Sequence, residues 1–265
     1  MSATTDRPAT DQQGTDQQAT DQPATDQPAT NRDATAGAAT DRTATDRTAL
    51  VVVDLQNDFC AGPVAAARYP GDPARLATVA ANTARAVKAA RAHGIEVLHV
   101  RFLGDPEHQG ASWRHRDAAL GKRPKCLDGS WGAQFHAVAP VPGEAVFTKL
   151  ACFDAFLSDG FEAHLARRDV HHLVFTGVFA DVCVDSSART AFQKGFHVTV
   201  LSDCTAALHL SDDTVLRFMR RVYGARVTTH DRSAVWSRLP EVSEQQEGPW
   251  PPRPEPVPAS TRASD

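Results

Sequence analysis

The stretch from His171 to Lys194, HHLVFTGVFADVCVDSSARTAFQK, contains a strand, a turn and the start of a helix. Leu173 to Thr176 is a run of aliphatic, aromatic and β-branched residues, which is typical of a strand buried on both faces. Gly177 interrupts the run, and from about Asp181 the apolar residues return with helical spacing. This strand–turn–helix unit predicts a parallel sheet, in which such junctions are the usual place for ligands.

Cys183 lies where this helix is expected to begin. The unpaired N–H groups and the positive end of the helix dipole favour a thiolate there, and the thiolate is the reactive form of cysteine. A free cysteine is also a common small buried residue. The stretch alone therefore leaves two interpretations open, a nucleophile or a core side chain.

Strand and helix patterns alternate along the rest of the chain. We predict further strands at 49–53, 95–102, 144–148, 197–201 and 225–228, and helices at 76–93, 161–168 and 211–223. This alternation predicts an α/β fold of three layers, with a mostly parallel twisted sheet of about six strands and helices on both faces, as in Rossmann-like proteins. The segment from Gly104 to Gly143 has neither pattern, and we expect an irregular loop that covers the site.

Two charged residues follow predicted strands. Asp54 comes directly after the strand at 49–53, and Lys149 comes directly after the strand at 144–148. Because the carboxyl ends of parallel strands share one edge of a sheet, we expect Asp54, Lys149 and Cys183 to meet in one crevice. There the aspartate would accept and return a proton, the lysine would stabilise negative charge, and the cysteine would attack an electrophile.

The composition divides the 265-residue chain into three parts. Residues 1–48 repeat a five-residue unit rich in Ala, Thr, Asp and Gln, with almost nothing to bury, and are predicted to be disordered. Residues 49–239 are long enough for one domain with a sizeable core. Residues 240–265 are rich in proline and are also predicted to be disordered.

Charge and cysteine usage narrow the function classes. The net charge of −4 is mild and the basic residues are scattered, so we expect neither a nucleic-acid nor a membrane partner. Five cysteines without CxxC spacing argue for a reducing compartment, and the protein is expected to be cytoplasmic. The cysteines other than Cys183 are predicted to be structural: Cys60, Cys126, Cys152 and Cys204.

Four motifs resemble those of the isochorismatase-like cysteine hydrolases. They are VVVDLQNDF at Asp54, GSWGAQFH before Lys149, TKLACFDAF around it, and GVFADVCVDSSARTAFQKGF around Cys183. The resemblance spans about residues 49–229. This superfamily holds N-carbamoylsarcosine amidases, ureidoacrylate and biuret amidohydrolases, nicotinamidases and isochorismatases.

The resemblance implies a role for each residue. Asp54 matches the general base of the family, Lys149 its catalytic lysine and Cys183 its nucleophile. It also implies a cis peptide between Val178 and Phe179, and an oxyanion hole formed by the backbone N–H groups of Phe179 and Cys183. The implied reaction is hydrolysis of an amide, ureido or lactam C–N bond through a thioester.

The substrate pocket is predicted to have an apolar wall, for which the candidates are Phe59, Trp113, Trp131, Phe153 and Phe179. Asp154, beside the lysine motif, is interpreted as a helix cap. Nicotinamidases of the superfamily hold a metal through an Asp-x-His pair, whereas Asp105 and His108 are spaced as DxxH. No metal and no cofactor are therefore expected.

Two other functions stay open at this point. The first is hydrolysis of an enol ether, as in isochorismatases, which generally lack this cysteine. The second is a catalytically silent scaffold that binds partners. We expect a small-molecule amide as the substrate and a homo-oligomeric assembly, with specificity arising from the segment 104–143 and a neighbouring subunit.

Overall fold

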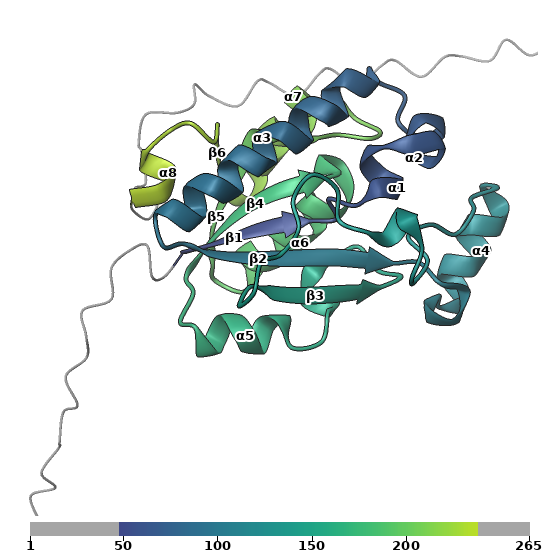
Figure 1. The fold of residues 1–265 in the computed structure, drawn as a ribbon, viewed down its shortest axis with the longest axis horizontal. Coiled ribbons are helices and arrows are strands. Elements are labelled where there is room, and N and C mark those ends of the chain that lie inside the picture. The colour runs from purple at the N-terminus through teal and green to yellow at the C-terminus, as the bar shows by residue number, and fades with distance from the viewer. Residues whose placement is uncertain (1–47, 238–265) are drawn as a thin grey trace, which may run out of the picture. The chain divides into compact units, whose positions relative to one another are not determined.

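The computed structural model describes residues 48–237, and the two predicted disordered segments lie outside this range, except for Thr48, which begins the first strand. Six strands form one sheet in the order β3-β2-β1-β4-β5-β6, and all pairs are parallel (Figure 1). The predicted α/β class and strand number are confirmed. The strands are β1 (Thr48–Val53), β2 (Glu96–Leu103), β3 (Ala145–Leu150), β4 (His172–Val178), β5 (His197–Ala206) and β6 (Arg226–Thr228).

Helices cover both faces of the sheet (Figure 1). On one face, α3 (Pro73–Ala92) packs on alternate residues of the central strands, with α8 (Ala234–Ser237) beside it. The other face carries α5 (Phe161–Arg167), α6 (Asp185–Gln193) and α7 (Asp212–Tyr223). Because β1 and β4 are buried on both faces, their sequences, TALVVV and HLVFTGV, are mostly apolar and do not alternate with polar residues.

The carboxyl edge of the sheet carries the short elements. There α1 (Asn57–Cys60) and α2 (Gly62–Arg68) follow β1, and α4 (Ala111–Ala119) follows β2. The prediction of an irregular segment at 104–143 was wrong for α4, in which Asp117 is the one buried residue. A helix without a buried apolar stripe carries no periodic signal in the sequence. None of the described helices is long and apolar enough to cross a membrane.

Candidate active site

The ends of β1, β3 and β4 bring Asp54, Lys149 and Cys183 together. Asp54 directly follows β1 in a left-handed conformation with φ of 51°, and its N–H donates to the carbonyl of Val100 in β2 at 2.8 Å. Lys149 is the fifth residue of β3 rather than the residue after it. Its Nζ lies 2.7 Å from Oδ2 of Asp54, and both side chains are fully buried.

Lys149 has three oxygen acceptors. Besides Asp54, its ammonium donates to the carbonyls of Phe153 at 3.0 Å and Cys152 at 3.5 Å, in the loop after β3. Burial lowers the pKa of Lys149, but the Asp54 carboxylate and the sulfur atoms of Cys183 and Cys152 together outweigh it, and the pKa ends above its ordinary value. Lys149 is therefore a fixed cation in the interior of the protein.

One oxygen of the Asp54 carboxylate is free to accept a proton. While Oδ2 binds Lys149, Oδ1 is buried without a hydrogen-bond partner among the described residues. Burial raises the pKa of Asp54, and the Lys149 charge and the Cys183 thiol partly offset this rise. A buried, unsatisfied carboxylate oxygen beside a thiol is a ready proton acceptor.

Cys183 lies in a π-helical turn (Ala180–Val184) that joins β4 to α6. Its side chain is 7% exposed. Burial and the Asp54 carboxylate raise its pKa, and Lys149 only partly opposes them. The helix start alone would favour a thiolate, whereas the loss of solvation and the nearby negative charge act in the opposite direction.

The turn before Cys183 has the predicted backbone. The peptide between Val178 and Phe179 is cis, as expected. The N–H groups of Val182 and Val184 both donate to the carbonyl of Phe179, at 3.0 and 3.2 Å. The hydroxyl of Ser187 donates to the carbonyl of Cys183 at 2.8 Å and accepts from the N–H of Ala155 at 2.9 Å, which ties the cysteine to the loop after β3.

Gln56 and its neighbours anchor the segments around the site. The Gln56 amide donates to the carbonyls of Phe102 and Ala133 at 3.0 and 2.9 Å and accepts from the N–H of Phe102 at 2.7 Å. The amide of Asn57 donates to the carbonyl of Trp131 at 2.8 Å, and Oδ2 of Asp58 accepts from the N–H of Cys126 at 2.7 Å. These contacts give a structural role to each polar residue of the LQND sequence that follows Asp54.

A pocket opens in front of Cys183 and encloses about 520 Å³, its open mouth included. Its lining includes four of the five predicted aromatic residues, namely Phe59, Trp113, Phe153 and Phe179. Trp131 does not line it, because its ring packs beside Gly62 and remains 52% exposed. Asp154 caps the turn after β3, with the N–H of Phe156 donating to Oδ1 at 2.9 Å.

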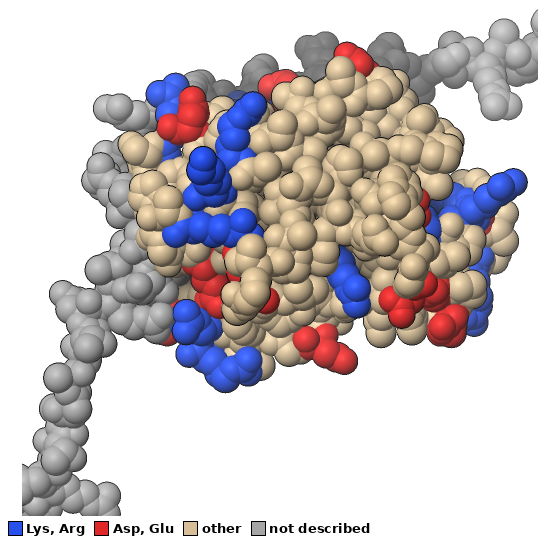
Figure 2. All heavy atoms as spheres, in the orientation of Figure 1, with Lys and Arg blue, Asp and Glu red and all other residues tan. Residues whose placement is uncertain are grey.

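The pocket also contains four basic side chains that the sequence did not single out: Arg68, Arg116, Lys122 and Lys125. Arg68 ends the short helix α2, and the others come from α4 and the loop after it. Lys and Arg side chains gather around α4 in Figure 2, at the right of the view. No spacing along the chain marks these residues, because they belong to two short helices with few buried residues and to a loop.

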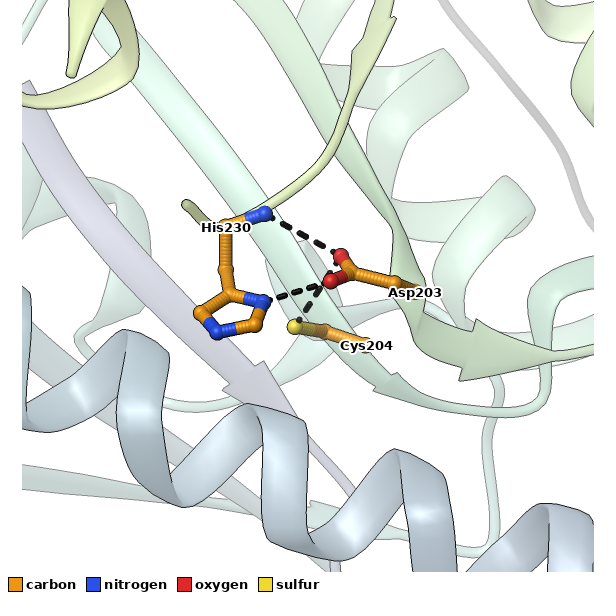
Figure 3. Close-up of side chains that lie close together, drawn as sticks. All are labelled: Asp203, Cys204 and His230. Atoms are coloured by element: carbon orange, nitrogen blue, oxygen red, sulfur yellow. Dashed lines mark hydrogen bonds and ion pairs between the residues drawn. The ribbon is translucent and has the colours of Figure 1, made fainter. Parts of the chain in front are cut away.

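One cluster outside the pocket has metal-ligand chemistry. Within the described chain, side-chain atoms of Asp203, Cys204 and His230 lie within 4.8 Å of one another (Figure 3). The Asp203 carboxylate already accepts from the ring and the backbone N–H of His230, at 2.5 and 3.1 Å, and lies 3.5 Å from the Cys204 sulfur. These bonds fasten the segment after β6 to β5.

Known proteins share this fold and sequence pattern. Residues 48–232 match the profile of the isochorismatase domain. Ureidoacrylate amidohydrolase RutB of Pseudomonas syringae pv. syringae is 33% identical over 173 residues, which cover 59% of this chain and 69% of that protein. RutB of Yersinia enterocolitica is 31% identical over 173 residues, covering 59% of this chain and 74% of that protein.

Solved structures agree with the fold. An isochorismatase family protein from Desulfovibrio vulgaris is 28% identical with a TM-score of 0.59, and the match covers 69% of this chain and 94% of that one. N-carbamoylsarcosine amidase from Thermoplasma acidophilum is 23% identical with a TM-score of 0.60, covering 70% and 98%. At that identity, the second likeness concerns the fold alone.

Proposed function

The chain belongs to the isochorismatase domain family, and from this premise we propose that it is a cysteine-dependent amidohydrolase. Its substrate is a small molecule with an amide, ureido or lactam C–N bond. The observation that carries the proposal is the buried contact of Asp54 with Lys149 beside Cys183, with one carboxylate oxygen unpartnered among the described residues. The names of the ureidoacrylate amidohydrolases support a C–N bond as the target.

In the first half of the reaction, the Cys183 thiol transfers its proton to Oδ1 of Asp54 as the sulfur attacks the carbonyl carbon. Lys149 stabilises the negative charge during this transfer. The backbone N–H groups of Phe179 and Cys183 hold the developing oxyanion. When the tetrahedral intermediate collapses, the C–N bond breaks, the nitrogen takes the proton from Asp54, and a thioester to Cys183 remains.

In the second half, water replaces the departed amine. Asp54 removes a proton from this water as its oxygen attacks the thioester carbonyl. Collapse of the second intermediate breaks the C–S bond, the acid leaves, and the sulfur recovers the proton from Asp54. The pKa values of Asp54 and Cys183 are both raised, with burial as the largest cause for each, so both side chains hold a proton more readily than in water.

The test is a panel of amides, N-carbamoyl amino acids, ureidoacrylate, biuret, nicotinamide, lactams and isochorismate, read by release of ammonia or acid. We expect Cys183→Ala and Cys183→Ser to lower kcat/KM by at least about a thousandfold with an unchanged circular dichroism spectrum. Cys152→Ala is the matched control, because it removes the neighbouring thiol and leaves the Cys152 carbonyl for Lys149. Turnover that survives in Cys183→Ala, on isochorismate or any amide, would contradict the proposal.

A further inference from the structure

The charged side chains that line the pocket all have one sign. Arg68, Arg116, Lys122 and Lys125 line it, and no Asp or Glu of the described chain does. Two of these cations are accounted for without a ligand. Arg116 is paired with Asp117 at 2.5 Å, and Lys122 is exposed to solvent.

Arg68 has no such partner. Its guanidinium lies 5.4 Å from the ring centre of Phe59 and 6.0 Å from that of Phe179, and Nη1 is buried without a hydrogen-bond acceptor in the described part of the chain. Burial lowers the pKa of Arg68, and the sulfur of Cys183 is among the groups that raise it. A guanidinium held on aromatic faces with a free N–H has an unfilled position for an acceptor.

Lys125 is the second cation without a partner among the described residues. Its ammonium lies 5.6 Å from the ring centre of Phe102. Burial and the Arg68 charge lower its pKa to about 8, so the two cations are close enough to repel each other. Mutual repulsion inside a pocket is relieved when an anion binds between them.

The segment with Lys125 is held in place before any ligand arrives. The N–H of the next residue, Cys126, donates to Asp58 at 2.7 Å, and the carbonyl of Cys126 accepts from Gly104 at 3.3 Å. Asp58 is thus engaged with the backbone and forms no ion pair with Lys125 or Arg68 in the residues described. Such anchoring reduces the entropy cost of binding.

We propose that Arg68 and Lys125 form a subsite for a carboxylate group, and that the substrate is a small amide or ureido compound with this carboxylate at the end away from its reactive carbonyl. The subsite and Cys183 line the same pocket, so one small molecule can occupy both. That the carboxylate belongs to an amide rests on the proposed function. The anion subsite itself does not, and it can be tested without turnover.

The test compares alkylation of Cys183 by iodoacetate, which carries a carboxylate, and by iodoacetamide, its neutral analogue. Both reagents require the thiolate, so changes in the Cys183 pKa cancel in the ratio of the two rates. Rates at Cys183 are read by peptide mass spectrometry in a Cys152→Ser background. We expect the iodoacetate rate divided by the iodoacetamide rate to be higher at Cys183 than for glutathione. This ratio should fall by about tenfold in Arg68→Gln and in Lys125→Gln, which corresponds to the loss of one hydrogen bond to a charged group.

Lys88→Gln is the matched control, since it removes the same charge at an exposed position on α3, outside the pocket lining, and should leave the ratio within about twofold. A wild-type ratio no higher than that of glutathione, or a ratio unchanged in both folded variants, overturns the subsite. Succinamate and butanamide then test the substrate class, with a kcat/KM preference for succinamate that Arg68→Gln abolishes. Equal kcat/KM values overturn the substrate class. If the alkylation ratios are as expected but no amide is hydrolysed, the subsite stands and the proposed function is rejected.

Discussion

The three central side chains form one buried cluster in which each shifts the pKa of the others. Asp54 and Lys149 are fully buried, and Cys183 is nearly so. A buried ion pair is costly unless its remaining hydrogen-bonding capacity is satisfied. Lys149 satisfies its own capacity with two backbone carbonyls, whereas Asp54 leaves Oδ1 unsatisfied among the described residues. The unsatisfied atom is the one that the proposed reaction uses.

Asp54→Asn should separate the reactivity of the thiol from catalysis. The change removes the negative charge that raises the pKa of Cys183 and leaves the Lys149 cation, which lowers it. More thiolate is then present at pH 7, and we expect iodoacetamide to react with Cys183 at least about tenfold faster, one pKa unit being a factor of ten in thiolate. Hydrolysis should be lost, because asparagine accepts no proton.

The measurement is peptide mass spectrometry of Cys183 after timed alkylation, with kcat from the substrate panel and circular dichroism to confirm folding. Asp154→Asn is the control. The Asp154 carboxylate caps the turn after β3 by accepting from the N–H of Phe156, and it is not among the groups that shift the pKa of Cys183. Slower alkylation in Asp54→Asn would mean that the resting proton already lies on Asp54.

The sequence predicts this group of residues better than it predicts the pocket. Asp54 and Lys149 stand at or near strand ends, and the parallel topology brings such ends together whatever the loop lengths. Arg68 and Lys125 lie far apart along the chain, the first at the end of the short helix α2 and the second in the loop after α4. Their meeting depends on the side-chain packing of Phe59, Phe102 and Phe179, which no periodicity encodes.

At the scale of the elements, strands and long helices follow the predicted pattern, and differences concentrate at the carboxyl edge. The strand predicted at 197–201 continues to Ala206 as β5, because a register irregularity opposite Phe175 and Gly177 accommodates three extra residues. Asp203 and Cys204 lie in this irregular part. A bulge has no side-chain period, so the alternation ends before the strand does.

The close pairing of β1 and β4 near the site depends on Gly177. Its φ is +99°, and a Cβ built there would overlap the carbonyl of Val53, the residue before Asp54. We expect Gly177→Ala to lower the free energy of unfolding by about 3 kcal/mol or more, since a left-handed conformation and a backbone collision add. Activity should fall as well, because Val53 cannot move without shifting Asp54.

Gly195→Ala provides the comparison for this substitution. Gly195 has a similar φ of +89°, but no atom outside its chain neighbours lies within 4 Å of the added Cβ. Its substitution should cost about 1–2 kcal/mol, the strain of the conformation alone, and spare activity. Urea unfolding and kcat of both variants test the argument, and equal losses would show that the approach to Val53 is unimportant.

For the whole molecule, buried titratable groups decide how stability depends on pH. His172 at the start of β4 is fully buried between hydroxyls, with Thr199 at 2.8 Å and Thr48 at 3.3 Å from its ring nitrogens. Burial, His197 and Arg226 lower its pKa from 6.5 to about 3. The surface ion pairs, in contrast, are exposed to solvent and contribute little.

His172 should therefore determine the start of acid destabilisation. Because its folded pKa lies below its unfolded pKa, the unfolded chain binds more protons, and stability is lost as the pH falls from about 6.5 towards 3. The free energy of unfolding should fall with a slope of up to about 1.4 kcal/mol per pH unit from this group. His172→Gln keeps a hydrogen-bonding side chain that does not titrate. In this variant the free energy of unfolding should depend less steeply on pH, by up to that slope, between pH 6 and 4.5. Below this range carboxylates such as Glu144, with an ordinary pKa of 4.5, begin to titrate as well.

His171 is the natural control, because it is the adjacent residue and its side chain is 50% exposed. His171→Gln should leave the slope unchanged. The measurement is urea unfolding at steps of half a pH unit. The variants are compared by the slope of the free energy of unfolding against pH, because the loss of the hydrogen bond to Thr199 lowers the stability of His172→Gln at every pH. Parallel curves for wild type and His172→Gln would assign the acid sensitivity to other buried histidines, of which His99 has its pKa shifted in the same direction.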